Sequence, residues 1–367
     1  MGSGVQPFTV QIPDQVLEDL RDRLRRTRFP PAAGTGWERG VDLDWLRAAV
    51  RRWADGYDWR AAEREINRWP NYRVEIDGAE IHFVHARGGG LPLLVTHGWP
   101  GSFLEMQRLV PLLVEAGFDV VVPSLPGYGF SAPPARPGVN CAVTADLWAE
   151  LMSRLGYARF GAQGGDMGAQ VSTWLALRHP ERLLGLHLNY IPGSYKPDPT
   201  LPPPSDEERA YLAEADAWVL AEGGYSHQQR TRPDTLGVGL DDSPAGLLAW
   251  IAEKLRGWSA DFERSFTLDD VLTHVMVYWV TRTGTSSVRL YLENKLRPVH
   301  FAAGERVRVP TAIARFPQEA PFPPLSFIRR GYDVERYTEM PRGGHFAAWE
   351  EPELLAADLR AFFAGRR

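Results

Sequence analysis

The chain has 367 residues, of which 44% are hydrophobic and 24% are charged, so it is long enough for one large core with an insertion. Its formal net charge of -5 and its pI near 6.0 exclude a general electrostatic attraction to nucleic acid or to an anionic membrane. We therefore expect a ligand that is recognised locally, and a small neutral molecule fits this charge best. The sequence leaves homodimerisation open.

The cysteine content and the first residues indicate a compartment. Cys141 is the single cysteine, so neither an intramolecular disulfide nor a cysteine-based metal or redox site can form. Residues 1–11 lack the basic start and the apolar run of roughly 7–15 residues that a secretion signal needs. No stretch approaches the ~20 apolar residues of a membrane span. We expect a soluble, cytoplasmic protein without a metal or other cofactor.

The first quarter of the chain changes from a helical to a strand-like pattern. From residue 13 to about residue 69, apolar residues recur at helical spacing, which predicts helices packed on another part of the protein. Between residues 72 and 97 the period shifts towards two and ends in the apolar run 91–95. This alternation is typical of strands that enter a sheet.

The next segments alternate strands with helices. Residues 119–123 form a short apolar strand, residues 142–155 have a helical pattern, and residues 158–163 form another strand. Such alternation predicts an α/β fold with a largely parallel sheet.

A second change of pattern follows Tyr190. The proline-rich stretch 191–204 leads into helical segments that continue to about residue 296, and these predict an inserted helical cap. The strand and helix pattern then resumes in 310–315, 332–340 and the amphipathic helix 351–363. The predicted units are an N-terminal segment with the first strands (1–90), an α/β core (91–193 and 301–367) and a cap (194–300).

The sharpest local motif is Gly164-Gly165-Asp166-Met167-Gly168, which lies between the strand 158–163 and a helix predicted to start near Ala169. Flanking glycines permit the strand-to-helix turn of a nucleophile elbow, which projects the central side chain above the sheet. An aspartate there is already anionic at neutral pH and can displace a leaving group at saturated carbon to form an ester. Taken alone, the motif fits equally well a glycine-rich turn with Asp166 as a helix N-cap.

A second motif, His97-Gly98-Trp99-Pro100-Gly101-Ser102, directly follows the apolar strand 91–95. In a sheet with a nucleophile elbow this loop supplies one oxyanion-hole amide and the residue after the nucleophile supplies the other, here Trp99 and Met167. For His97 we prefer a structural role in the loop over a catalytic one. Trp99, Met167 and Phe103 are also the expected substrate-binding residues.

A third motif, Arg342-Gly343-Gly344-His345-Phe346, follows the last predicted strand. His345 is the best candidate for the base, because it completes the chain order of nucleophile, acid and histidine. The acid is expected one strand earlier, where Glu319 follows the strand 310–315, and Asp333 is the competing candidate.

These residues together resemble the microsomal-type epoxide hydrolases, a family that includes soluble microbial members and the juvenile-hormone hydrolases. The resemblance covers nearly the whole chain and implies an α/β-hydrolase fold with a helical cap and a helical N-terminal segment. The matching segments are Pro7 to Pro30, His97 to Ser102, Gly164 to Gly168, Gly224 to Gln229, Asp242 to Pro244, Tyr291 to Asn294, Phe316 to Glu319 and Arg342 to Glu353.

The resemblance also implies a reaction. Two cap tyrosines hold the epoxide oxygen in that family, and the matching positions are Tyr225 and Tyr291. Phenols suit this task, because a pKa near 10 lets them donate a proton to an alkoxide without being ionised at pH 7. The implied catalyst is therefore an epoxide hydrolase in which Asp166 forms a hydroxyalkyl ester that His345 and Glu319 then hydrolyse with water. Position 167, often tryptophan in relatives, is methionine here.

Three other functions fit these motifs less well. A haloalkane or haloacid dehalogenase would use the same aspartate ester, but Met167 offers no side-chain donor for a departing halide. An esterase is disfavoured because aspartate replaces the serine acyl acceptor. A non-catalytic small-molecule binding protein would not require all five of the candidate catalytic residues.

The substrate is less well defined by the sequence. Thirteen tryptophans favour an apolar or aryl epoxide. All basic residues except the lysines at 196, 254 and 295 are arginine, which is typical of a GC-rich genome and fits a bacterial natural-product pathway, including the enediyne type.

Overall fold

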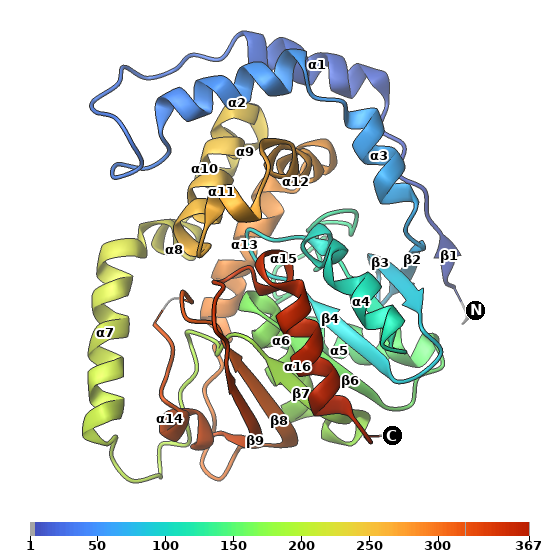
Figure 1. Cartoon of the computed structure of the whole chain (residues 1–367), viewed down its shortest axis with the longest axis vertical. Coiled ribbons are helices and arrows are strands. Elements are labelled where there is room, and N and C mark those ends of the chain that lie inside the picture. Colours follow the sequence, from blue (N-terminus) through green and yellow to red (C-terminus); the bar gives the residue numbers. More distant parts are fainter. Residues whose placement is uncertain (1–3, 320, 367) are drawn as a thin grey trace.

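A computed structural model describes residues 4–319 and 321–366, and a nine-stranded sheet forms its centre (Figure 1). The strand order is β1-β2-β3-β5-β4-β6-β7-β8-β9; β3 pairs antiparallel with β5, and every neighbouring pair from β5 to β9 in this order is parallel. The strands are β1 (Gln6–Pro7), β2 (Asn71–Ile76), β3 (Ala79–Arg87), β4 (Pro92–Thr96), β5 (Asp119–Pro123), β6 (Phe160–Gly164), β7 (Leu183–Leu188), β8 (Val307–Arg315) and β9 (Tyr332–Glu339). The predicted α/β class and largely parallel sheet are confirmed.

Helices cover both faces of this sheet, as continuous burial of its central strands requires. Helix α4 (Leu109–Glu115) packs on α16 (Pro352–Phe363), which lies in front of the sheet in Figure 1. Behind the sheet, α5 (Cys141–Arg154) packs on α6 (Asp166–Arg178). Before α4, the loop at 97–102 leads into a 3-10 turn at Phe103–Gln107.

Between β7 and β8 the chain forms the helical cap. Ser205 begins it with a capping box, in which its side chain accepts from the Glu208 N–H and the Glu208 side chain accepts in return. The cap helices are α7 (Asp206–Glu222), α8 (Gly224–Gln229), α9 (Pro233–Asp242), α10 (Pro244–Trp258), α11 (Phe262–Ser265), α12 (Leu268–Thr281) and α13 (Gly284–Leu296). Shorter elements in the C-terminal part are α14 (Leu325–Arg329) and α15 (Ala347–Glu350).

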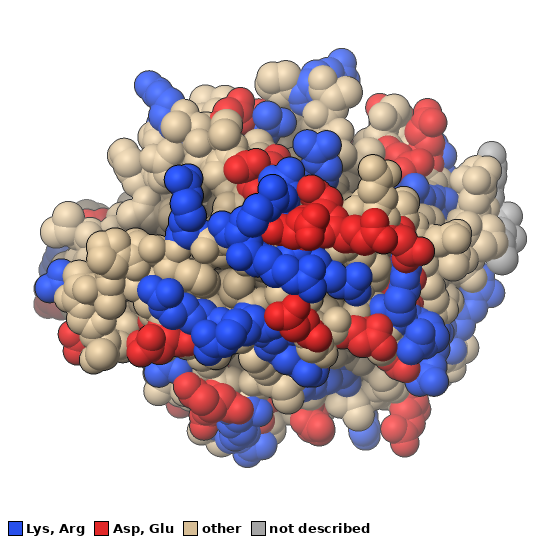
Figure 2. Space-filling view, turned by 90° about the horizontal axis from the view of Figure 1, so that it is seen from above, with Lys and Arg blue, Asp and Glu red and all other residues tan. Residues whose placement is uncertain are grey.

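The N-terminal helices α1 (Asp14–Arg25), α2 (Leu43–Asp55) and α3 (Trp59–Asn67) lie over the cap rather than over the sheet (Figure 1). Both α1 and α2 pack on α10, and Tyr57 after α2 hydrogen-bonds Thr273 of α12 at 2.9 Å. Seen from this side, basic and acidic side chains are interleaved, so the face carries no patch of a single sign (Figure 2).

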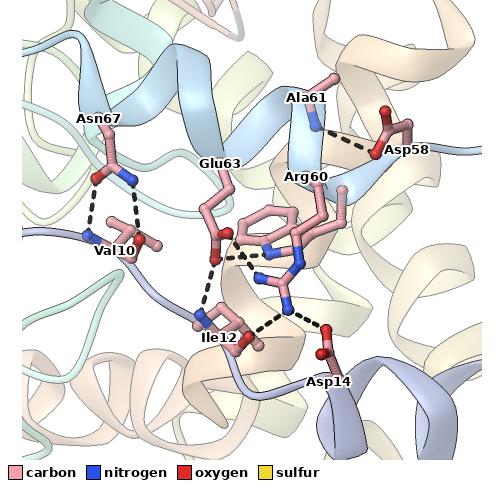
Figure 3. Close-up of polar contacts among 9 residues, drawn as sticks. Val10, Ile12, Asp14, Asp58, Arg60, Ala61, Glu63 and Asn67 are labelled. Atoms are coloured by element: carbon pink, nitrogen blue, oxygen red, sulfur yellow. Dashed lines mark hydrogen bonds and ion pairs between the residues drawn. The ribbon is translucent and has the colours of Figure 1, made fainter.

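A polar clamp ties the chain before α1 to α3 (Figure 3). Asn67 bonds both the N–H and the carbonyl of Val10, at 2.7 and 2.8 Å, and Glu63 accepts from the Ile12 N–H at 2.7 Å. Arg60 closes the clamp by donating to Glu63 and Asp14. The clamp joins the edge strand β1 to the helices over the cap, so the N-terminal segment connects sheet and cap.

No helix in 4–319 or 321–366 is long and apolar enough to cross a membrane.

Candidate active site

Asp166 occupies a tight turn where β6 ends and α6 begins. Its φ of 47° is left-handed, and α6 starts at this residue, three positions before the predicted Ala169. The turn brings backbones so close that a Cβ on Gly168 would lie 1.9 Å from the carbonyl oxygen of Thr96, and one on Gly98 would lie 2.2 Å from Asp166 Oδ1. Glycine is thus required at both positions, and the strained aspartate is held at the end of the sheet.

Two backbone amides point at the Asp166 carboxylate. The Trp99 N–H donates to Oδ1 at 2.7 Å, and the Met167 N–H bonds the same side chain. Burial raises the pKa of Asp166 above its ordinary value, against the stabilising effect of His345 and of these two amides. The loop of Trp99 is fixed by the cap, because His274 and Tyr278 of α12 bond the carbonyls of Pro100 and Gly101 at 2.6 and 2.5 Å.

His345 faces the other carboxylate oxygen from the loop after β9. Its Nε2 lies 3.6 Å from Asp166 Oδ2, and its Nδ1 lies 2.8 Å from Oε1 of Glu319, whose side chain is 1% exposed. Asp333, the competing acid, is exposed at the start of β9. Of the two candidate acids, Glu319 is therefore the one that contacts the imidazole.

The charge state of His345 depends on its carboxylate neighbours. Burial by itself lowers the pKa of the imidazole, but the charge and hydrogen bond of Glu319, together with Asp166, raise it to about 9. At neutral pH the resting site therefore contains an imidazolium between two carboxylates.

The two cap tyrosines meet over Trp99. The Tyr225 ring from α8 stacks on the Trp99 indole at 5.5 Å and 9°, and the Tyr291 ring from α13 lies edge-on to it at 5.7 Å. The two tyrosine rings are 5.9 Å apart and their hydroxyls are hydrogen-bonded. Burial raises the pKa of both phenols above 10, and the Asp166 charge adds to this effect, so both are neutral proton donors at pH 7.

A cavity of about 10 Å³, room for about one water molecule, lies beside Asp166 and His345. Glu105 and Gln163 line it, and Gln163 Oε1 is buried without a hydrogen-bond partner among the residues that the structure describes. Burial raises the pKa of Glu105 to about 8. The sequence motifs did not single out Glu105. In the structure a Cβ at Gly101 would lie 2.3 Å from the Glu105 carboxylate, so that glycine makes room for it.

Of the other residues singled out from the sequence, Met167 adjoins the nucleophile, whereas Phe103 and His97 have structural contacts. Met167 is buried, and its sulfur accepts from the Asn294 amide of α13 at 3.1 Å. Phe103 is not brought to Asp166, because its fully buried ring packs on His82 and Phe130 instead. His97 accepts from the Leu125 N–H at 3.2 Å, which fits the structural role expected for it. Within 4–319 and 321–366, no group of acidic, histidine or cysteine side chains could hold a metal ion.

Comparisons with known proteins agree with this geometry. Residues 5–106 match the model of the epoxide hydrolase N terminus, and residues 92–222 match that of the alpha/beta hydrolase fold. A protein of Stigmatella aurantiaca is 43% identical, over 98% of this chain and 85% of its own. Epoxide hydrolase 1 of Sus scrofa is 37% identical, over 98% and 88%.

Solved structures are similar over the same extent. The juvenile hormone epoxide hydrolase of the silkworm Bombyx mori superimposes with a TM-score of 0.87 at 30% identity, covering 99% of this chain and 95% of that one. Fold, sequence and site thus lead to one assignment: the chain belongs to the epoxide hydrolase family of α/β-hydrolase-fold enzymes.

Proposed function

We propose that the protein hydrolyses an apolar or aryl epoxide to a vicinal diol through a covalent ester on Asp166. The observation that carries this proposal is the placement of one carboxylate, Asp166, between two backbone amides and a histidine, beneath two phenols. An anionic nucleophile with neutral acids opposite it is the arrangement that opening a strained ether requires.

In the first half-reaction an Asp166 oxygen forms a bond to an epoxide carbon, and the bond from that carbon to the epoxide oxygen breaks. The electron pair moves to the oxygen, which takes a proton from Tyr225 or Tyr291. The product is a hydroxyalkyl ester and one phenolate. Because the ester is neutral, this step removes the Asp166 charge, one of the negative charges that raise the pKa of His345.

The second half-reaction begins from that change. His345 gives its proton to the phenolate and becomes a neutral base. Its Nδ1 keeps the 2.8 Å hydrogen bond to Glu319. It then removes a proton from water, and the hydroxide attacks the Asp166 carbonyl carbon while the Trp99 and Met167 amides stabilise the oxyanion. Collapse breaks the bond to the diol oxygen, which takes the hydroxyl proton of the intermediate, so the diol leaves and the carboxylate is restored. His345 is already an imidazolium from the first proton transfer, so the net change is the addition of one water.

The small cavity beside Asp166 is the proposed position of that water. It borders both Asp166 and His345, and Glu105 and Gln163 offer it hydrogen-bond partners. With a pKa near 8, Glu105 is largely protonated at pH 7 and presents a donor without adding a charge next to the ester.

Trp99, Tyr225, Tyr291 and Trp258 give the space above Asp166 aromatic walls, which supports an apolar or aryl epoxide as substrate. Composition alone supports a bacterial natural-product substrate, including one of the enediyne type. A panel of aliphatic and aryl epoxides with chiral analysis of the diols tests both parts. Matched halides belong in the same panel, because halide release without diol formation would favour a dehalogenase.

A single turnover with enzyme in excess, run in ¹⁸O-labelled water, tests the covalent route. The diol should contain only unlabelled oxygen, and one label should appear in the peptide that contains Asp166. Label found in the diol with none in Asp166 would contradict the ester.

A further inference from the structure

Lys254 is a buried cation on the cap side of the site. It belongs to α10, is 7% exposed, and its ammonium lies 4.7 Å from the centroid of the Tyr225 ring and 5.8 Å from that of Trp258. The carboxylate of the adjacent Glu253 holds the ammonium at 2.7 Å. Burying a charged lysine side chain costs free energy of folding. Its position over the ring of Tyr225, a candidate catalytic residue, therefore suggests a function.

The electrostatic surroundings of Tyr225 show what such a cation can do. Burial is the main cause that raises the pKa of its phenol, and the negative charges of Asp166, Glu253 and Glu319 raise it further, against the hydrogen bond with Tyr291. Burial and these charges therefore oppose release of the phenolic proton. A cation over an aromatic face is attracted by the ring, and the attraction grows as negative charge develops on the phenol oxygen.

We propose that Lys254 is a positioning residue that acts through Tyr225, strengthening this phenol as the proton donor to the oxygen that leaves the epoxide carbon. This inference rests on the proposed function and extends it. When the carbon–oxygen bond breaks and the phenolic proton moves to the departing oxygen, negative charge builds on Tyr225 beneath the ammonium. The interaction is thus stronger in the transition state than in the ground state, which is the condition for accelerating the step. Once the phenolate has been reprotonated by His345, attack of water on the ester involves no proton transfer from Tyr225 and gains nothing from Lys254.

The two half-reactions can be timed separately with styrene oxide as the probe, by following tryptophan fluorescence during ester formation and diol release afterwards. Lys254→Met retains most of the length of the side chain and removes its charge. We expect ester formation to slow by about tenfold or more, and ester hydrolysis to stay within about twofold of wild type. The same substitution at the exposed Lys295, near the end of α13, is the matched control and should change neither rate.

A second variant separates charge from anchoring. If the Lys254 to Glu253 ion pair served only to fix α10, Glu253→Gln would slow ester formation as much as Lys254→Met. Under the proposal it does not, because the cation stays over Tyr225 while one opposing carboxylate is lost. Equal slowing by the two variants would overturn the inference.

A more acidic phenol provides the decisive readout. Replacing Tyr225 by a fluorinated tyrosine in the Lys254→Met variant should restore most of the lost rate of ester formation, which a purely structural role of Lys254 could not do. No restoration, or wild-type ester formation by Lys254→Met, would refute the role of Lys254. If methionine unfolds the cap, as judged by circular dichroism, Lys254→Gln takes its place in the same comparison. Absence of any ester in the wild type with the whole epoxide panel would instead refute the proposed function.

Discussion

The α/β core presents charged and titratable groups to Asp166, whereas the cap presents neutral phenols. On the core side, His345 carries a raised pKa of about 9 between Glu319 and Asp166, and Glu105 a raised pKa of about 8. On the cap side, the pKa values of Tyr225 and Tyr291 are raised above 10, and the ammonium of Lys254 lies over the face of the Tyr225 ring.

This difference assigns the two half-reactions to the two regions. Under the proposed mechanism, opening the epoxide needs a core nucleophile and cap acids together. Once the cap phenolate has taken its proton from His345, hydrolysis of the ester draws on the core side alone. Variants of the core and of the cap should therefore fail at different steps, and the following expected effects run from the largest to the smallest.

Asp166→Asn should abolish turnover, with a loss of at least about 10⁴-fold, because the amide cannot serve as an anionic nucleophile. Initial rates of diol formation measure the loss, and intact mass of the protein after exposure to epoxide should show no adduct. A variant that retained more than about a hundredth of the activity would contradict a nucleophilic Asp166.

Tyr291→Phe and Tyr225→Phe should each slow ester formation by about 10²-fold, since each removes a proton donor to the departing oxygen. The rate of ester hydrolysis should remain close to wild type in both variants, and stopped-flow fluorescence separates the steps. Equal slowing of ester formation and ester hydrolysis would contradict the assignment of the two steps to different regions.

Glu105 offers a milder test on the core side. Glu105→Leu removes the proposed partner of the water and should slow ester hydrolysis by about tenfold, the value of one hydrogen bond of about 1.4 kcal/mol. Glu105→Gln resembles the protonated carboxyl and should hydrolyse the ester at nearly the wild-type rate at pH 7. If the leucine variant slowed ester formation instead, the water position would be wrong.

The same residue makes stability depend on pH. Its folded pKa of about 8 exceeds the ordinary 4.5, so its contribution to stability is fully present below about pH 4.5 and is lost as the pH rises through about 8. Glu105→Gln should match the wild type in urea unfolding at pH 5 and exceed it at pH 9. Parallel stability curves for the two proteins would show that Glu105 does not titrate this way.

The smallest effect is expected where the N-terminal segment contacts the cap. Tyr57→Phe removes the 2.9 Å hydrogen bond to Thr273 and should lower the free energy of unfolding by about 1 kcal/mol, without changing either half-reaction. Tyr72→Phe is the matched control, because the Tyr72 hydroxyl makes no hydrogen bond to any residue that the structure describes. A change in ester formation with Tyr57→Phe would mean that this contact also shapes the site.

The core side of the site was open to prediction from sequence because its residues follow strands. The carboxyl ends of parallel strands meet at one edge, so motifs after the strands at 158–163, 310–315 and 332–340 were expected to converge. The structure brings Asp166, Glu319 and His345 to that edge in the predicted chain order. Spacing alone could not choose between Glu319 and Asp333, because that choice depends on the path of a loop.

The cap side was not predictable in the same way. Tyr225 and Tyr291 lie 66 positions apart on helices whose mutual packing has no periodic signature in the sequence, so only the family resemblance selected them. Lys254 and Glu105 belong to ordinary helical patterns, and their burial against the site follows from tertiary packing. Phe103 was expected near the substrate because it follows the oxyanion loop, but the 3-10 turn directs its ring into the core beside His82.

The most direct test of the covalent mechanism is the intact mass of His345→Gln after mixing with styrene oxide. This variant keeps Asp166 and both tyrosines but lacks the base, so the ester should form and persist. The predicted result is a mass increase of one epoxide per chain, located by peptide mapping at Asp166. A variant that stays unmodified while the wild type turns over the same epoxide would contradict the Asp166 ester.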